Sequence, residues 1–528
     1  MRKPAVAWYV GSLLFSFALL YVATRSSILI GDGGAFVNMV RGGDPAHIHY
    51  GEPGHFLQVP LARAVWHLLE RLGLPVSAEG VSVAISIAGT LAAIVFVGLI
   101  AAEILHTQAA AWLAAILFGT SLNAWTQSNG ELYGLALGFV AAGLFLALRG
   151  RAAAPAVLWA LSVLSHSEFA LAAPAFVAAA WMAQPDASTR GERLQKVSTL
   201  VVLAGTCCAI FLLFGSWAIG KWVDAASLAG WLQRSFAARE PDMAGSPEVI
   251  RAIKGLLTAF TVAGHYWRDI LTGRGQYSAS GFLSAAVIGF FVLAFTGVLL
   301  AAAVRQRGLL LFALAWLLPF HLGVNWWFEP TVEKYHAGAL PGFVLLVTGG
   351  LVAIAVRLRP RGRYLLYGVY MVACAGLNLF GALLPMQALG RDVAGAEREI
   401  RRLTDEGGGR SVFVACDDPK VLVNAGVPFL RMRSVWVGTV QEIRQALTTW
   451  TSDRLREGKE PYLVGRWCLP EEWKTPWSKE PFDMFFLERS FKMVPTGIGD
   501  VPITQSVPTN PFSWTRGDLI RLEPKSGS

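Results

Sequence analysis

Apolar stretches of about 20 residues recur along this chain from residue 8 to about residue 385. A helix of that length spans about 30 Å, which is the thickness of the hydrocarbon core of a bilayer. Charged residues make up only 15% of the 528 positions and hydrophobic residues 54%, whereas roughly a quarter of the residues in soluble domains are charged. The sequence therefore predicts an α-helical polytopic membrane protein.

About eleven transmembrane helices are predicted from these stretches. They lie near residues 8–28, 81–104, 108–125, 132–149, 153–166, 168–184, 198–220, 281–304, 308–326, 337–356 and 364–385. The first is predicted to be retained, because no small-residue cleavage site follows it. The chain then divides into a transmembrane domain, residues 1–388, and a small soluble α/β domain, residues 389–528, in which strand-like and helix-like segments alternate and predict a partly parallel sheet.

Lys and Arg residues concentrate in the short loops on one side of the predicted spans, which is typical of cytoplasmic loops. The N-terminus is therefore predicted to be cytoplasmic, in a plasma (bacterial inner) membrane. The long loops 29–80 and 221–280 and the C-terminal domain are predicted to be extracytoplasmic. Topology accounts for the net charge of +9, so no nucleic-acid partner is expected. The sequence leaves open whether Cys416 and Cys468 form a disulfide on the oxidising side.

Two loop segments have apolar residues at helical spacing, Gly54 to Leu74 and Val249 to Leu271. Each is predicted to form a helix at the membrane interface. In the second, Tyr266 and Trp267 lie beside His265 and Arg268, and this pattern fits a surface helix as well as a substrate site.

Polar and ionisable residues gather at the predicted outer ends of the spans, beginning with Asp32 directly after the first span. The others are His47, His49, Glu52, His55, Asn129, Glu131, Tyr133, His166, Glu168, His321, Glu329, Glu333, Lys334, Tyr335 and His336. Because ionisable groups near a membrane are costly, such a group indicates a functional site. For two members a structural role is the alternative: His166 as the cap of a turn, and Glu131 as an acid at a helix N-terminus. The first-loop histidines match no strong metal-ligand spacing, so no cofactor is expected; a divalent metal ion is left open but is not favoured.

Four passages together with Asp32 resemble the GT-C class of membrane glycosyltransferases, which includes protein O-mannosyltransferases and lipid A aminoarabinose transferases. They are HYGEPGHFLQVPLARAVWHLL (49–69), NGELYGLALGF (129–139), LSVLSHSEFALAAPAF (161–176) and EKYHAGALPGFVLL (333–346). The resemblance covers about residues 8–385. Many relatives have a second acid beside the first-loop aspartate, whereas Gly33 and Gly34 stand here, and this departure favours a metal-free mechanism.

The resemblance implies transfer of a sugar from a polyprenyl-phosphate carrier to an acceptor hydroxyl on the extracytoplasmic face, with inversion at the anomeric carbon. Asp32 is then expected to be the general base, and Lys334, with His336 and Arg268 behind it, to stabilise the departing phosphate. The substrate-binding residues expected on the same basis are His49, Glu52, His55, Glu131, Tyr133, His166, Glu168, His265, Arg268, Lys334, Tyr335 and His336.

Two other functions stay open: a transporter or flippase of a lipid-linked saccharide, and a non-catalytic scaffold of an envelope assembly. The absence of an internal repeat in the sequence disfavours the transporter. A scaffold would not require Asp32. The sequence does not identify the donor sugar, nor whether the acceptor is a protein, a lipid or a polysaccharide. The C-terminal domain contains no phosphate-binding glycine motif, so a regulatory or acceptor-binding role is expected for it.

Overall fold

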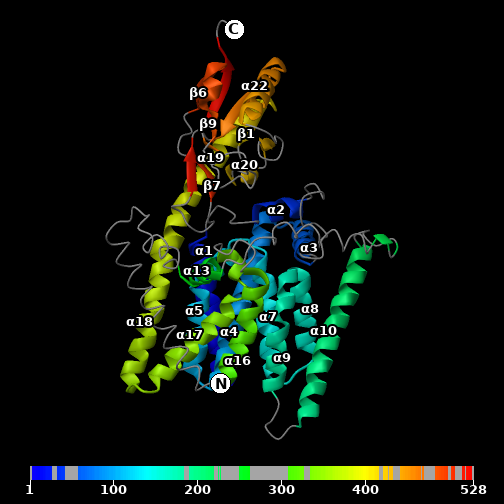
Figure 1. The fold of residues 1–528 in the computed structure, drawn as a ribbon, viewed down its shortest axis with the longest axis vertical. Helices are drawn as coiled ribbons and strands as arrows, with labels where there is room; N and C mark the ends of the chain where they lie inside the picture. The colour runs from blue at the N-terminus through cyan, green and yellow to red at the C-terminus, as the bar shows by residue number, and fades with distance from the viewer. Residues whose placement is uncertain are drawn as a thin grey trace. The chain divides into compact units, whose positions relative to one another are not determined.

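The structure is a computed structural model that describes most of the chain. The described residues are 3–25, 33–41, 57–183, 189–218, 224, 226–227, 249–261, 307–325, 333–415, 420–425, 427–431, 440–464, 467–468, 482–496, 501–505, 514–517 and 519–525. The chain forms two compact units: Met1–Arg25 with Ile30–Leu384, and Ser26–Leu29 with Pro385–Ser528. Each unit is described separately below (Figure 1).

The first unit is helical. Its elements are α1 (Lys3–Ala23), α2 (Gly33–Arg41), α3 (Gln58–Arg71), α4 (Ala78–Leu105), α5 (Gln108–Gly119), α6 (Leu122–Ser128), α7 (Tyr133–Leu148), α8 (Ala153–Ser165), η2 (Ser167–Ala172), α9 (Ala173–Met182), α10 (Arg190–Ala218), α13 (Val249–Phe260), α16 (Arg307–Phe320), η3 (His321–Asn325), η4 (Glu333–His336), α17 (Leu340–Ala355), α18 (Pro360–Asn378) and η5 (Leu379–Leu383).

Apolar helices confirm the predicted class of helical membrane protein. Within the described residues, five helices are long and apolar enough to cross a bilayer, and the bent pair α5 and α6 makes a sixth if it forms one span. Shorter apolar helices cover Tyr133–Leu148, Ala153–Ser165, Ser167–Met182 and Leu340–Ala355. Every predicted span corresponds to helix except 281–304, which lies outside the described residues. The total of eleven spans stays a prediction.

Helices α4 and α7 pack backbone to backbone through glycines. A Cβ atom added at Gly89 would lie 2.5 Å from the carbonyl of Gly134, and one added at Gly138 would lie 2.6 Å from the carbonyl oxygen of Gly89. Small residues allow apolar helices to approach this closely, and the gain is van der Waals contact, because lipid supplies no hydrophobic driving force. This contact fixes the start of α7, where Tyr133 lies, against α4.

Local capping explains why the expected span 108–125 is two helices. Thr107 accepts a 3.1 Å bond from the amide of Ala110 and caps α5, and Ser121 accepts a 3.1 Å bond from Ala124 and caps α6. A second N-cap inside the run starts a new helix, and the pair is bent by 64°. The indole of Trp125 on α6 donates to the backbone oxygen and hydroxyl of Thr24. The bend therefore brings α6 against the end of α1.

Helices α2 and α3 lie at the end of the first unit where α1 finishes (Figure 1). An apolar cluster joins them to α4 and to the start of α7; its buried members are Phe36, Met39, Val40, Val59, Ala62, Ala78 and Leu132. The second half of α3 exposes Leu68, at 57%, and the residue after the helix, Leu72, is 65% exposed. This amphipathic pattern agrees with the predicted interfacial helix.

The second unit confirms the predicted small α/β domain. Helix α19 (Leu384–Glu406) leads into strands β1 (Ser411–Ala415), β2 (Phe429–Arg431), β3 (Glu460–Val464), β6 (Phe491–Pro495) and β9 (Leu519–Pro524). They form one sheet in the order β2-β1-β3-β9-β6. The pairs β1 with β2 and β1 with β3 are parallel, whereas β9 is antiparallel to both of its neighbours.

Helices and short strands complete this unit: α20 (Lys420–Ala425), α22 (Val440–Arg456), β4 (Trp467–Cys468), β5 (Phe482–Asp483), η7 (Met484–Arg489), β7 (Val501–Gln505) and β8 (Trp514–Gly517). The cluster around Phe413 and Tyr462 contains side chains of α19 and α20. The cluster around Val414 and Leu463 contains Ile443 and Leu447 of α22. The two faces of β1 and β3 are thus covered by different helices, because neighbouring strand residues point to opposite sides.

Candidate functional site

Helix α6 is a fully buried polar helix inside an apolar unit. Asn123, Thr126 and Gln127 are each 0% exposed, and Ser128 and Asn129 are 2% exposed. The helix packs against η4 and α13. Buried polar groups in a membrane protein are costly and mark functional regions. The surroundings of α6 are therefore a candidate functional site.

His166 stacks on Tyr133 at the turn between α8 and η2. The two ring centroids are 4.1 Å apart, with 30° between the ring planes, and Nδ1 of His166 lies 3.9 Å from Oε2 of Glu168. All three side chains are at most 9% exposed. His166 is the C-cap residue of α8 and the N-cap residue of η2, as its predicted alternative role requires, but its side chain makes no capping hydrogen bond to η2. Its ring contacts Tyr133 and Glu168 instead.

Asn325 connects the end of η3 to η4. Its Nδ2 donates a 2.7 Å hydrogen bond to the carbonyl oxygen of Tyr335, so its Oδ1 is the acceptor that lies 3.2 Å from Nδ1 of His321. His321 must then carry its proton on Nδ1. The ring of His336 lies edge-on to that of His321, with 5.6 Å between centroids.

These two groups meet through Tyr133 and Tyr335, whose ring centroids are 6.4 Å apart in an edge-to-face contact. We call the joined set the buried polar cluster. Its members are Tyr133, His166, Glu168, His321, Asn325, Tyr335 and His336. Tyr335 is its partly exposed member, and the other side chains are buried. Glu131, two positions before Tyr133 in the chain, is also completely buried.

Helix α13 borders the cluster. It packs on η4, α6 and α17, burying Ala252, Leu256 and Phe260 while Ile250 stays 84% exposed. Nδ2 of Asn378 donates to the carbonyl oxygens of Thr120 at 2.8 Å and Phe260 at 3.0 Å. One amide therefore ties α13 to the break between α5 and α6. Of the predicted interfacial segment Val249 to Leu271, the part described by the structure is α13 together with Thr261.

The cluster combines a carboxyl group, three imidazoles, two phenols and an amide in a largely buried setting. Electrostatic interactions are strong in such a setting, and carboxyl and imidazole groups can accept, hold or donate protons. Within the residues that the structure describes, no three His, Cys, Asp or Glu side chains are arranged to hold a metal ion. These residues can supply proton transfer and hydrogen bonding.

The structure brings together several residues that the sequence places in the site: Tyr133, His166, Glu168, Tyr335 and His336. Glu131 is buried two positions before Tyr133. The backbone of Lys334 lies in η4, and its side chain is not among the described parts of the structure. Asp32, His49, Glu52, His55, His265 and Arg268 also lie outside the described residues, as does Cys416. Glu131 lies directly before Leu132, the N-cap residue of α7, so it stands at the N-terminus of that helix, as its alternative role requires.

Two further residues belong to this region and are missed by sequence reasoning, Asn325 and Gln58. Asn325 follows His321 by one helical turn, and that spacing is the signal that points to it. Gln58 is a lone amide in an apolar helix start, at 0% exposure. Nothing in its local sequence distinguishes it from a surface glutamine.

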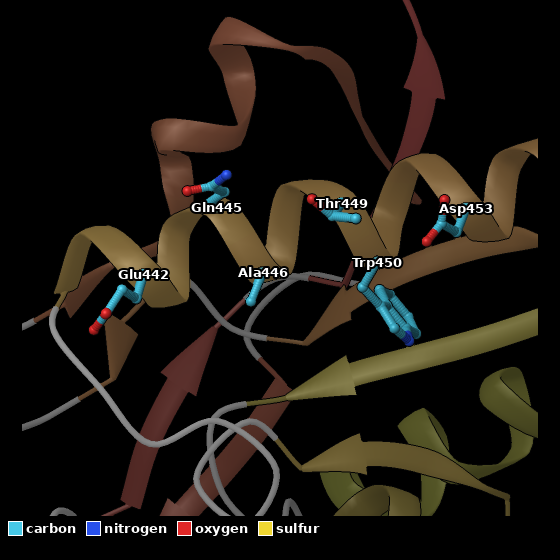
Figure 2. A pocket seen from close by; sticks show the side chains of 6 residues that line it. All are labelled: Glu442, Gln445, Ala446, Thr449, Trp450 and Asp453. Carbon is cyan, nitrogen blue, oxygen red and sulfur yellow. The ribbon is translucent and has the colours of Figure 1, made fainter.

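The second unit has a shallow hollow along one side of α22. It is lined by Glu442, Gln445, Ala446, Thr449, Trp450 and Asp453, and Figure 2 shows these side chains spaced along the helix, with Trp450 directed toward the sheet. Trp450 packs against the cluster around Val414 and Leu463, so it is part of the core as well as of the hollow.

The chain has a GT-C fold like that of ArnT. It is similar to the crystal structure of ArnT from Cupriavidus metallidurans bound to undecaprenyl phosphate, with 14% sequence identity, a TM-score of 0.52 and coverage of 99% of this chain and 98% of ArnT. The apo state of the same ArnT gives a TM-score of 0.53 at 14% identity, covering 98% of each chain. No family model matches the sequence. No curated protein matches it either.

Proposed function

We propose that this chain is a membrane glycosyltransferase that moves a sugar from a polyprenyl-phosphate donor to an acceptor hydroxyl on the extracytoplasmic face. The observation that carries the proposal is the buried polar cluster within a GT-C fold similar to an ArnT that binds undecaprenyl phosphate. A lipid-linked donor needs hydrocarbon for its tail and polar groups for its phosphate and sugar. Apolar helices with a polar cluster offer both.

Asp32 is the proposed general base, and contacts on both sides of it in the chain support this role. Thr24, at the end of α1, binds Trp125 of α6. Helix α2 begins at Gly33, directly after Asp32, and its Phe36 and Val40 share an apolar cluster with Leu132. Leu132 lies between Glu131 and Tyr133, so the chain before and after Asp32 is attached beside the buried polar cluster.

In the proposed reaction the acceptor oxygen attacks the anomeric carbon on the face opposite the phosphate. The acceptor proton passes to the carboxylate of Asp32, and the bond between the anomeric carbon and the phosphate oxygen breaks. The polyprenyl phosphate leaves with the bonding electron pair. Lys334, supported by His336 and Arg268, is proposed to stabilise the developing negative charge, and no metal ion is required.

The test compares wild type, Asp32→Asn and Asp44→Asn in membranes supplied with radiolabelled undecaprenyl-phosphate hexoses. Asp44→Asn is the matched control, because it removes an acid from the same predicted loop. We expect label transfer by wild type and Asp44→Asn, and a loss of about 100-fold or more in Asp32→Asn. Equal transfer by folded Asp32→Asn would reject Asp32 as the base. Movement of the donor across vesicles without covalent transfer would favour the flippase alternative.

A further inference from the structure

Gln58 has a completely buried side-chain amide that makes no hydrogen bond to any residue that the structure describes. The side chain is 0% exposed, and neither Oε1 nor Nε2 has a partner in the described part of the chain. Buried amide groups in proteins are nearly always paired, because an unpaired buried donor or acceptor loses its bonds to water without replacement. A buried amide whose donor and acceptor are both unpaired therefore indicates that a binding partner is missing.

Contacts of the two neighbouring residues place Gln58 beside the buried polar cluster. The amide of Leu57 donates a 2.9 Å bond to the carbonyl oxygen of Leu164, which lies just before His166. Val59 belongs to the same apolar cluster as Leu132, the residue between Glu131 and Tyr133. The residue before Gln58 therefore bonds to Leu164, two positions before His166, and the residue after it packs with Leu132, one position before Tyr133. The rings of His166 and Tyr133 stack on each other.

The chemistry of the amide indicates which part of a lipid-linked donor it fits. Nε2 can only donate and Oε1 can only accept. The phosphate of a polyprenyl-phosphate sugar offers only acceptors at neutral pH, so it would leave Oε1 unpaired. A sugar hydroxyl donates and accepts at once, and two neighbouring hydroxyls can satisfy both ends of one amide.

We propose that Gln58 is a specificity-determining residue that binds hydroxyl groups of a sugar in this site. The proposal rests on the proposed function and adds a contact that the resemblance does not assign. The sugar is the donor's hexose or a glycan of the acceptor, since both present the same hydroxyl chemistry.

The test measures ligand-dependent thermal stability of the full chain in detergent. Three variants are compared: wild type, Gln58→Leu, and Thr348→Val as the matched control. Thr348 in α17 is also 0% exposed, and its hydroxyl makes no hydrogen bond to a described residue. Without ligand, both substitutions should leave the melting temperature unchanged or higher, because each removes an unpaired buried polar group. A residue with a purely structural role would lower it.

The ligands are undecaprenyl phosphate, undecaprenyl-phosphate glucose, undecaprenyl-phosphate mannose and a lipid-free hexose trisaccharide. We expect Gln58→Leu to bind undecaprenyl phosphate like wild type and to bind its preferred hexose-linked donor about tenfold more weakly. Thr348→Val should match wild type throughout. A selective loss of trisaccharide binding would also support the proposal and assign the hydroxyls to the acceptor side.

Two results would overturn the inference. If Gln58→Leu binds every sugar ligand like wild type, the amide holds an enclosed water or nothing. If it loses affinity for undecaprenyl phosphate itself, the amide contacts the phosphate. Failure of wild type to bind any polyprenyl phosphate or sugar would instead count against the proposed function. The assignment of a sugar ligand to Gln58 would then fail as well.

Discussion

The side-chain amide of Asn325 donates a 2.7 Å hydrogen bond to the backbone oxygen of Tyr335 and accepts one from the ring of His321. One residue therefore sets both the position of η4 and the tautomer of a buried histidine. Lys334 and His336 belong to η4, so the geometry that the proposed mechanism needs depends on a side chain with no assigned chemical role.

Substituting Asn325 tests this positioning role. Asn325→Leu removes both bonds and leaves two buried groups unpaired, at a cost of about 1–3 kcal/mol each. Because a displacement of about 1 Å at a reacting centre can cost about 100-fold in rate, we expect a loss of that order in sugar transfer. Asn325→Asp keeps the acceptor for His321 but cannot donate to Tyr335, so it should also be impaired. Wild-type turnover in Asn325→Leu would contradict the role.

Two substitutions of His166, which stacks on Tyr133, distinguish a packing role of this residue from a role in substrate binding. His166→Phe keeps an aromatic ring against Tyr133 and removes both ring nitrogens, whereas His166→Ala removes the stack. If His166 binds substrate, both variants should raise KM about tenfold, and only His166→Ala should lower thermal stability. Donor titrations of the purified variants measure this. An unchanged KM in His166→Phe would reduce His166 to a packing residue.

The glycine contact between α4 and α7 predicts that a glycine-to-alanine substitution lowers stability at Gly89 and not at Gly205. Gly89→Ala places a methyl group 2.5 Å from the backbone of Gly134, and overpacking of this kind costs about 1–3 kcal/mol. Gly205→Ala in α10 meets no atom within 4 Å. We expect a lower melting temperature for Gly89→Ala alone, together with lower activity, because α7 carries Tyr133. Equal stability of the two variants would show that α4 and α7 can separate without cost.

Topology is tested by thiol labelling in a chain from which Cys207, Cys208, Cys374, Cys416 and Cys468 have been removed. A membrane-impermeant maleimide added to intact cells should label Asp32→Cys, since position 32 is predicted to be extracytoplasmic. Arg151→Cys, in a predicted cytoplasmic loop, should react only after the cells are opened. If position 32 is labelled only from the cytoplasmic side, that result contradicts both the proposed orientation of the chain and the proposed reaction.

Much of the fold is predictable because hydropathy is a local property. A run such as Ala78–Leu105 is apolar enough to cross a bilayer whatever its neighbours do. The strand at Ser411–Ala415 is predictable for a similar reason. Strand-like and helix-like segments alternate along this part of the chain, and that alternation predicts a partly parallel sheet, in which this strand pairs with its neighbours. The division of the run 108–125 at Ser121 was not predicted, although its polar residues Ser121 and Asn123 lie in a sequence typical of an N-cap.

The candidate site is predictable only in part. Ionisable residues at span ends identify Glu131, His166 and His336 as a group, since each is costly near a bilayer. The partners of these residues do not follow from that rule. Gln58 and Asn325 have side chains that are unremarkable in a sequence, and only their burial makes them informative.

The sequence by itself determined that the chain is a helical membrane protein with a soluble α/β unit, because both depend on sums over neighbouring residues. Only the tertiary structure decided that Tyr133 lies on His166 and that Asn325 holds Tyr335. Those contacts arise where glycines, caps and short breaks let particular helices approach. Packing of this kind depends on the shapes of surfaces distant in sequence, and no local pattern records it.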